Sequence, residues 1–407
     1  MTAIGPHRVP ETAAPQGEHG DGRMYTVAGC YFVASFAALG LPPYLTDMLP
    51  ELGDPTARWA GLLYVVPTVF GGLGAPLWGR LADRFGRKRL LLRAQLGLAV
   101  AFLLAGWADS VPVFTAALVL QGVLGGTFAA SNGYLGAALR GPALARALTV
   151  LQGSARAALV FAPIVVGLLS HWISPHRQYA VLALLPLAAA LLLATLPEPE
   201  RPAVIDESDS VATSSASLRA LFTLEFVFVF ATVISFPYLL ALVGARLPGV
   251  APVVAGILFA LPHLVYLVSA VWVQRLVGTG PLRPVALGFA CLAVGLAAHA
   301  VVDSLSGFVL ARLVLGAGLT LCLVGRNMLA ADCAAGRAPG GMFGSLEFFA
   351  KAGAVAAGVA ATAAAVRFGP AAPALVGGLA AGAAMAGSLA VEVRAKIRST
   401  RWSRTCS

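Results

Sequence analysis

Apolar residues follow one another in runs along nearly the whole chain, and short polar segments separate these runs. A run of about 18 or more apolar residues is long enough to cross the hydrocarbon core of a bilayer as an α-helix. The pattern therefore predicts an all-α membrane protein with twelve transmembrane helices. We place these helices at residues 24–46, 58–78, 90–108, 112–138, 147–170, 179–197, 218–243, 251–274, 285–302, 307–330, 340–365 and 371–393.

Composition supports this assignment. Of the 407 residues, 58% are hydrophobic and only 11% are charged, which excludes an ordinary water-soluble globular protein. The formal net charge of +10 is compatible with a nucleic-acid partner. Most Lys and Arg residues, however, fall in segments that the helix map places on one side of the membrane, and such an excess marks the cytoplasmic side. We therefore expect both termini in the cytoplasm, a lipid bilayer as the surroundings, and no nucleic acid.

Polar segments divide the chain into parts. Residues 1–23 carry Pro, Gly, His and acids, so we expect a disordered cytoplasmic N-terminus rather than a signal peptide. Residues 198–217, rich in Pro, Ser and acids, are expected to link two six-helix bundles at 24–197 and 218–393. Residues 394–407 form a basic cytoplasmic tail.

The two predicted bundles resemble each other when one is shifted along the other by about 194 or 195 residues. LVLQG at 118–122 then lies opposite RLVLG at 312–316, Asn132 lies opposite Arg326, and Arg156 lies opposite Lys351. Two parallel repeats of six helices imply a pseudo-twofold axis along the membrane normal, with a cavity where the repeats meet.

The segment GRLADRFGRKRL at 79–90, between the second and third helices, combines glycines, one acid and five bases. Gly79 and Gly86 permit a tight connection, while Asp83 can accept hydrogen bonds at a neighbouring helix N-terminus or pair with Arg87 or Arg140. We expect a conformational latch between the bundles. The simpler alternative is that the bases only fix topology, but this explains neither the acid nor the glycines.

With this turn in this place, the chain resembles the major facilitator superfamily of secondary transporters over about residues 24–393. The family signature G-x-L-a-D-r-x-G-r-k is matched at Gly79, Leu81, Asp83, Arg84, Gly86, Arg87 and Lys88. The resemblance implies the two-bundle fold, alternating access to a small-molecule substrate, function as a monomer, and location in a bacterial inner membrane. Within the superfamily the chain looks most like the proton-antiporting drug and siderophore exporters.

Two further family motifs depart from their usual form. Helix four of proton-coupled members carries an Arg four residues before a Gly, but this chain has Leu118 before Gly122 and places the Arg in the second half, as Arg312. The helix-five motif g-x-x-x-G-P-x-x-G-G appears as ALVFAPIVVG, which keeps Pro163 and Gly167. The resemblance thus favours export by antiport without establishing it.

Ionisable groups deep in a membrane helix are costly, so each one indicates a functional site. Arg156 lies deep in helix five with Gln152 on the same face, and Lys351 lies as deep in helix eleven with Glu347 on the same face. Polar residues at matched depth on helices four, five, ten and eleven predict a substrate cavity, to which aromatic residues could contribute. The predicted substrate-binding residues are Gln121, Asn132, Gln152, Arg156, Arg326, Asn327 and Lys351, with Tyr64, Tyr134 and Tyr266.

Three bases of this cavity, Arg156, Arg326 and Lys351, stand against one acid, Glu347. Surplus positive charge favours a carboxylate-bearing substrate, because Arg holds a carboxylate by two parallel hydrogen bonds. Two alternatives remain open: Glu347 and Lys351 form an internal pair, and Arg326 reaches only the headgroups.

Proton coupling requires a group that titrates in the working range. Glu347 is the first candidate, and His263 in helix eight is the second, although a buried His is more often a packing residue. Asp47, Asp303 and Glu225 lie near helix ends, where solvated helix caps are the expected use.

The sequence contains no phosphate-binding loop, zinc motif or nucleophile elbow, and its five cysteines have no metal-ligand spacing. We expect no enzymatic activity, no cofactor and no metal site. The predicted function is proton-coupled export of a small amphipathic or carboxylate-bearing metabolite such as a siderophore. The alternatives are a broad multidrug:proton antiporter and an importer of organic anions.

Overall fold

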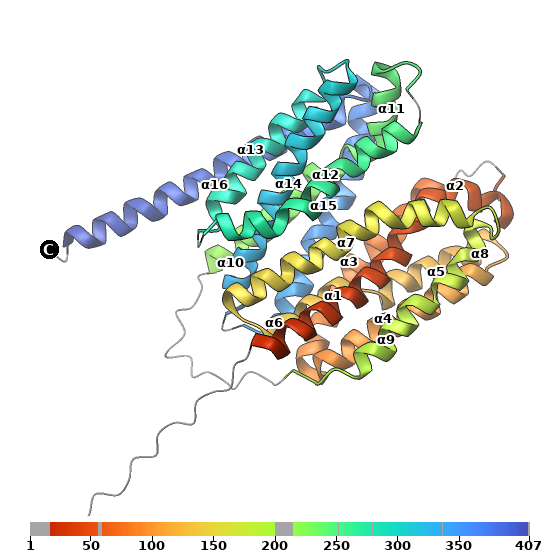
Figure 1. Ribbon diagram of the computed structural model, residues 1–407, viewed down its shortest axis with the longest axis horizontal. Helices are drawn as coiled ribbons and strands as arrows, with labels where there is room; N and C mark the ends of the chain where they lie inside the picture. The colour runs from red at the N-terminus through yellow and green to blue at the C-terminus, as the bar shows by residue number, and fades with distance from the viewer. Residues whose placement is uncertain are drawn as a thin grey trace, which may run out of the picture.

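The computed structural model describes residues 17–55, 59–199, 215–250, 252–278, 280–335 and 337–405. Within these ranges the chain is helical and contains no strand. The helices form two elongated bundles that lie side by side (Figure 1).

The N-terminal bundle consists of six membrane-spanning segments, of which the fourth and the sixth are each divided into two helices. Short helices α2 (Leu45–Met48), η1 (Pro42–Tyr44) and η2 (Leu49–Leu52) follow the first segment. The spanning helices are α1 (Gly17–Gly40), α3 (Ala60–Phe85), α4 (Arg87–Trp107), α5 (Val111–Leu124), α6 (Thr127–Ala138), α7 (Gly141–Leu169), α8 (Pro175–Leu182) and α9 (Leu184–Ala194).

The C-terminal bundle also contains six segments, and its first is divided at Ile234 and Ser235. Its helices are α10 (Ser215–Val233), α11 (Phe236–Arg246), α12 (Pro252–Leu276), α13 (Leu282–Ala298), α14 (Leu305–Ala334), α15 (Pro339–Phe368) and α16 (Ala372–Thr405).

Each of the twelve predicted spans coincides with one of these segments in the described part of the chain. Nine of the segments are long and apolar enough to cross a membrane by themselves, and α13 is a shorter apolar helix of 17 residues. The fold class predicted from the hydrophobic pattern is confirmed.

Two helix ends differ from the expectation. Helix α1 begins at Gly17 and not at residue 24, and α16 continues to Thr405, through most of the segment expected as a tail. Polar residues continue a helix at little cost once it has left the hydrocarbon, because water satisfies the exposed groups of its surface. Hydropathy therefore marks the end of the membrane and not the end of the helix.

The fourth segment breaks at Gly125 and Gly126. Gly126 has a φ of 79°, a left-handed conformation that favours glycine. The carbonyls that the break releases find donors on neighbouring helices: Trp78 Nε1 donates to Val123 O at 2.7 Å, and the Arg93 guanidinium donates to the carbonyls of the next two residues. Arg93 also stacks on the Trp78 ring, 3.7 Å from its centroid. In a membrane such substitute donors are what makes a broken helix tolerable.

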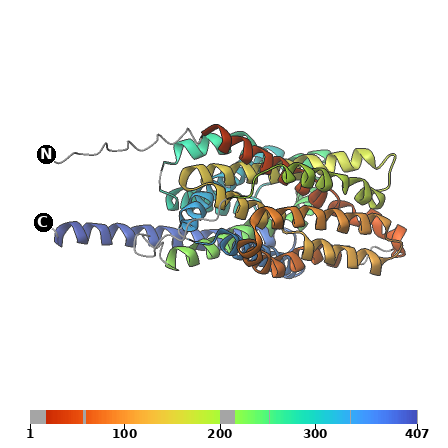
Figure 2. The same ribbon diagram turned by 90° about the horizontal axis from the view of Figure 1, so that it is seen from below.

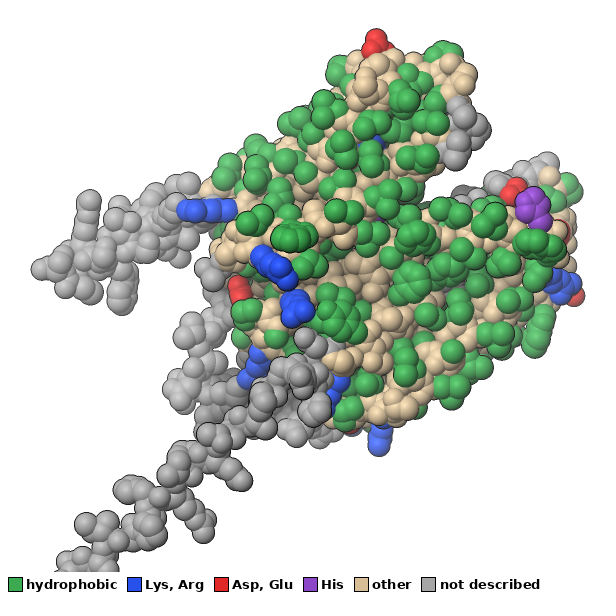
Figure 3. Space-filling view, viewed as in Figure 1, with side chains coloured by type: hydrophobic (Ala, Val, Ile, Leu, Met, Phe, Trp, Pro, Cys, Tyr) green, Lys and Arg blue, Asp and Glu red, His purple; other side chains and the backbone are tan. Residues whose placement is uncertain are grey.

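One end of the molecule carries most of its visible positive charge, and we call it the basic face (Figure 3). Helix α3 ends and α4 begins at this face, in the segment 79–90, and α16 leaves the bundle there (Figures 1 and 2). At the opposite face the two bundles separate, and the space-filling view shows a notch between their ends. The bundles are therefore closed together at the basic face and apart at the other.

Candidate substrate cavity and interbundle latch

Asp83, near the end of α3, joins the two bundles at the basic face. Its Oδ1 accepts a hydrogen bond from the backbone N–H of Gly340 at 3.0 Å, and its Oδ2 accepts one from Gly341 at 2.7 Å. Both donors are unsatisfied groups in the first turn of α15, where the helix dipole also favours a negative charge. Arg87 holds Asp83 Oδ1 from the other side at 3.0 Å. The contact expected from the sequence is present, with Arg87 as the paired base, while Arg140 lies exposed at the start of α7.

Small residues allow α3 and α15 to approach closely enough for this contact. A Cβ on Gly79 would overlap the carbonyl oxygen of Gly340, and a Cβ on Gly72 would lie 2.8 Å from Lys351 Cβ. A Cβ on Gly344 would lie 2.5 Å from the carbonyl oxygen of Ala75. The glycines of α3 therefore act through close helix packing.

Glu198, a carboxylate that the sequence did not single out, also stabilises the turn between α3 and α4. Glu198 Oε1 accepts from the backbone N–H groups of Arg87 at 2.6 Å and Lys88 at 3.2 Å, at the start of α4. Lys88 Nζ donates to Ala194 O at 2.7 Å. The remaining signature residue, Arg84, is exposed with its guanidinium over the Phe85 ring. Glu198 stands just after a helix end in the sequence, where a loop carboxylate gives no pattern of its own.

Two further hydrogen bonds tie the bundles together deeper in the membrane. Tyr266 of α12 donates through its hydroxyl to the carbonyl oxygen of Thr149 on α7 at 2.8 Å. Asn327 Nδ2 of α14 donates to Thr149 Oγ1 at 3.3 Å. Tyr266, predicted to line the substrate cavity, is therefore part of the interbundle closure, and so is Asn327.

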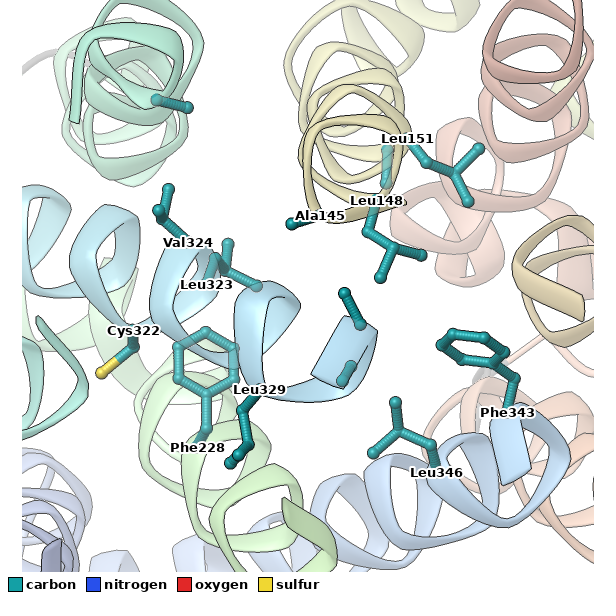
Figure 4. Close-up of a cluster of buried hydrophobic side chains, with 14 of the residues drawn as sticks. Ala145, Leu148, Leu151, Phe228, Cys322, Leu323, Val324, Leu329, Phe343 and Leu346 are labelled. Carbon is teal, nitrogen blue, oxygen red and sulfur yellow. The ribbon is translucent and has the colours of Figure 1, made fainter. Parts of the chain in front are cut away.

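A small polar cavity lies between the bundles beside these bonds. Asn132 and Gln152 approach it from the N-terminal bundle, and Glu225, Arg326 and Asn327 approach it from the C-terminal bundle. Apolar side chains, among them Leu148 of α7 and Phe343 and Leu346 of α15, close its wall (Figure 4). Its volume of about 10 Å³ leaves room for about one water molecule. Four residues predicted to bind substrate thus converge from both repeats, in a cavity that is nearly filled in this conformation.

Glu225 forms a buried ion pair with Arg326 in the wall of this cavity. Only 4% of each residue is exposed, and the Arg326 guanidinium also lies 4.2 Å from the centre of the Phe228 ring. The expectation that Glu225 is a solvated helix cap is wrong, and so is the alternative that Arg326 reaches only the headgroups. The sequence placed Glu225 about two turns inside the predicted helix 218–243, but nothing in it revealed that a base on α14 faces the acid.

Arg156 lies near the middle of α7, half-buried. Its Nε is buried without a hydrogen-bond partner, and the guanidinium forms no ion pair with any side chain in the described ranges. Tyr31 of α1, Tyr266 and His263 of α12 and Arg326 lie within electrostatic range of it.

Glu347 and Lys351 pair with each other along α15, with Lys351 Nζ 3.5 Å from Glu347 Oε1. Glu347 is buried, whereas the Lys351 side chain is 37% exposed. The internal pair that the sequence left open as an alternative is therefore the observed arrangement. Neither residue lines the small polar cavity.

His263 is buried on α12, between the rings of Phe236 and Phe259, each with its centroid 6.1 Å away. Neither ring nitrogen has a hydrogen-bond partner among the described residues. Its aromatic surroundings resemble a packing site more than a proton path, so its coupling role remains a prediction.

Three other predicted binding residues lie away from the cavity. Tyr134 is buried within the N-terminal bundle and donates its hydroxyl to Pro197 O at 2.8 Å, so its role is packing and not substrate contact. Tyr64 is 56% exposed and lies near the start of α3, away from the basic face. Gln121 keeps a buried Oε1 without a partner on α5, but it is outside the cavity wall.

Within the described ranges no group of His, Cys, Asp and Glu is arranged to hold a metal ion.

Comparison with known proteins agrees with this architecture. The human organic anion transporter MFSD10 has a similar fold, with a TM-score of 0.75 and 18% identity over 91% of this chain and 99% of that one. The proton:xylose symporter XylE also matches, with a TM-score of 0.72 and 12% identity over 91% of this chain and 95% of that one.

Curated relatives match a shorter part of the sequence. The multidrug resistance protein MdtG of Yersinia enterocolitica is 31% identical over 164 residues, and that of Klebsiella pneumoniae is 31% identical over 151 residues. These matches span about two fifths of the length of the relatives. The profile of the Major Facilitator Superfamily matches residues 27–307, more than half of the chain. This protein is therefore a multi-pass membrane protein that belongs to the Major Facilitator Superfamily.

Proposed function

We propose that the protein exports small amphipathic organic compounds of several kinds, driven by inward proton flow. The observation that carries this proposal is the small polar cavity, which residues from both repeats enclose next to the interbundle closure. A cavity at that place is exposed to one side of the membrane at a time when the bundles rock about it. The name of the curated relatives, multidrug resistance protein, supports a broad choice of substrate.

The charge balance of the region favours a broad amphipathic substrate over a polycarboxylate. The sequence offers three bases and one acid for this region, and the structure adds Glu225 as a second acid, paired with Arg326. Since Lys351 is paired with Glu347, Arg156 is the one of the three predicted cavity bases that has no acidic partner in the described part of the chain. One surplus positive charge is a weaker basis for choosing a polyanion.

We further propose that the basic face lies in the cytoplasm of a bacterial inner membrane, because Lys and Arg accumulate on the cytoplasmic side of membrane proteins. The conformation described here is then closed to the cytoplasm and open outward. Helices 24–197 and 218–393 act as two rocking bodies joined by the segment 198–217, and one chain suffices for transport.

Inverted membrane vesicles with an acidic lumen test this function. Three pyrene compounds that differ only in their end group serve as probes: pyrenebutanol, pyrenebutylamine and pyrenebutyrate. We expect uptake of the neutral and cationic probes, and loss of uptake when the proton gradient is collapsed. Asn132→Leu should reduce uptake about tenfold, as removal of one buried hydrogen-bonding group does. Arg140→Gln, at an exposed position, is the matched control. Uptake of no probe, or uptake that ignores the gradient, would refute the proposal.

A second candidate, export of a carboxylate-bearing metabolite such as a siderophore, is favoured by Arg156. A partly buried guanidinium without an acidic partner is suited to a substrate carboxylate. In that case pyrenebutyrate is the preferred probe, and Arg156→Ala abolishes its transport while the variant still folds and inserts. Equal transport of pyrenebutyrate by this variant would remove the argument for an anionic substrate.

A further inference from the structure

The Glu225–Arg326 pair is built entirely within the C-terminal bundle but faces the partner bundle across the cavity. Glu225 comes from α10 and Arg326 from α14, and both side chains line the cavity wall together with Asn132 of α6. The Nε and Nη1 atoms of Arg326 are buried without hydrogen-bond partners among the described residues, as is Asn132 Oδ1. Arg326 therefore holds donor capacity that Glu225 does not use.

A buried ion pair has an electrostatic consequence for any ligand beside it. While Glu225 is ionised, it neutralises Arg326, and a nearby ligand experiences a dipole and not a net charge. If Glu225 loses its charge, the guanidinium remains buried with one positive charge and no counter-ion. An unpaired buried cation is costly, so it would attract an anionic ligand and repel a cationic one.

We propose that Glu225 is a specificity-determining residue that conceals Arg326 from the substrate, so that loss of its charge converts the small polar cavity into an anion-binding site. This inference rests on the proposed function only in taking the cavity as the substrate site. The class of ligand that the uncovered Arg326 accepts is a monocarboxylate, which can engage the unused guanidinium N–H groups.

The same arrangement gives protonation of Glu225 a defined effect. A proton on Glu225 exposes Arg326 to the cavity, which drives out a cationic compound and retains an anionic one. A cationic substrate and the proton therefore exclude each other, as antiport requires, whereas an anionic substrate and the proton bind together. The charge of the substrate sets the direction of its coupling to protons.

The other ionisable groups around the pair are few. Helix α15, which packs on α10, brings Glu347 and Lys351, already paired with each other. Arg156 of α7 lies within electrostatic range of Arg326. Helix α13 carries Arg283 and Cys291, and the part of α16 with described side chains carries no ionisable residue. Glu225 is the carboxylate in direct contact with Arg326.

Binding of the three pyrene probes to the purified full chain tests the proposal without requiring transport. In Glu225→Gln we expect pyrenebutyrate to bind about tenfold more tightly and pyrenebutylamine about tenfold more weakly, corresponding to about 1.4 kcal/mol each. Binding of pyrenebutanol should stay unchanged. The double variant Glu225→Gln with Arg326→Gln should restore the charge preference of the original protein. Unchanged preference in Glu225→Gln, or a changed preference that persists in the double variant, would overturn the proposal.

A second measurement avoids the risk that Glu225→Gln does not fold. The single variant Arg326→Gln leaves Glu225 as the unopposed charge of the pair, so pyrenebutylamine should bind about tenfold more tightly and pyrenebutyrate about tenfold more weakly than to the unsubstituted protein. An unchanged charge preference in Arg326→Gln would refute the role of Glu225. Failure of the proposed function looks different, because then pyrenebutanol does not bind to the original protein at all.

Discussion

In the two repeats the second and fourth helices pack through the same contact, but the fourth helix continues differently beyond it. In each, a glycine of the fourth helix packs on a proline of the second: Gly122 of α5 lies against Pro67 of α3, and Gly316 of α14 lies against Pro262 of α12. In the C-terminal repeat α14, 30 residues long, runs through this contact without a break. In the N-terminal repeat the equivalent segment breaks three residues after its glycine and continues as α6.

The donors that stabilise the two repeats differ accordingly. A proline has no N–H, so Pro262 leaves the carbonyl of Leu258 without its helical donor. Arg312 of α14 donates to this carbonyl and to that of Phe259, both at 2.7 Å. At the position that matches Arg312, the N-terminal repeat has the apolar Leu118. In this repeat Arg93 of α4 donates instead to carbonyls at the break between α5 and α6. The comparison indicates a rigid helix in one repeat and a jointed one in the other.

The arginine of the rigid repeat should give the largest effect on stability. Arg312→Leu leaves the buried carbonyl of Leu258 without a donor and removes a second hydrogen bond, to the part-buried carbonyl of Phe259, so we expect a loss of about 3 kcal/mol in the free energy of unfolding. Denaturation of the purified protein in detergent measures it. Arg246→Gln is the control, since Arg246 donates to one carbonyl, that of Ala300, at a partly exposed site. Similar stability losses in the two variants would contradict the role assigned to Arg312.

The arginine of the jointed repeat should matter somewhat less. Arg93→Ala removes the donors to Leu124 and Gly125 and the stacking on Trp78, which we expect to cost about 2 kcal/mol. The equivalent position in the other repeat is Leu287, which is 57% exposed, and Leu287→Ala is expected to be nearly neutral. Equal changes in the free energy of unfolding for the two substitutions would show that Arg93 does not stabilise the break between α5 and α6.

The latch is a second asymmetry, because only the N-terminal repeat places an acid at this turn. The matching segment, QRLVGTGPLR, contains none. Asp83→Asn should weaken the closure of the basic face by about 1.4 kcal/mol, or tenfold in population. A thiol introduced by Gly133→Cys, which faces Gly340, should then react about tenfold faster with a water-soluble maleimide. An unchanged reaction rate, compared with the Arg140→Gln control, would show that Asp83 does not hold this closure.

The smallest expected effect concerns the backbone of the joint. Gly126→Ala places a side chain at a φ of 79° and should cost about 1 kcal/mol, although no atom lies within 4 Å of the new Cβ. Gly244→Ala is the control, because Gly244 is an exposed helical residue of α11 without a left-handed φ and no atom lies within 4 Å of its new Cβ, so this substitution should not destabilise the protein. A neutral Gly126→Ala would mean that the break does not depend on a left-handed residue.

The fold could be predicted from the sequence because the length of an apolar run is a local property of the chain. The sequence also identified Asp83, since the residues of the signature turn lie within a few positions of one another in the chain. Glu225 and Glu198 were not recognised as partners, because their contacts join residues separated by more than 100 positions. Tyr134 shows the converse error, since an aromatic residue has the same helical position whether it faces a cavity or a neighbouring helix. Pairing across helices is a property of packing, and a single sequence records it only weakly.

Spin-label distances across both faces test the central claim most directly, namely that the two repeats close over the polar cavity at the basic face and open it in turn. Arg89 and Leu276 are exposed at the basic ends of α4 and α12, and Trp172 and Val301 are exposed near the opposite ends. On addition of pyrenebutylamine, we predict that the Arg89–Leu276 distance lengthens while the Trp172–Val301 distance shortens. Distances that stay fixed, or that change in the same direction at both faces, would contradict the account.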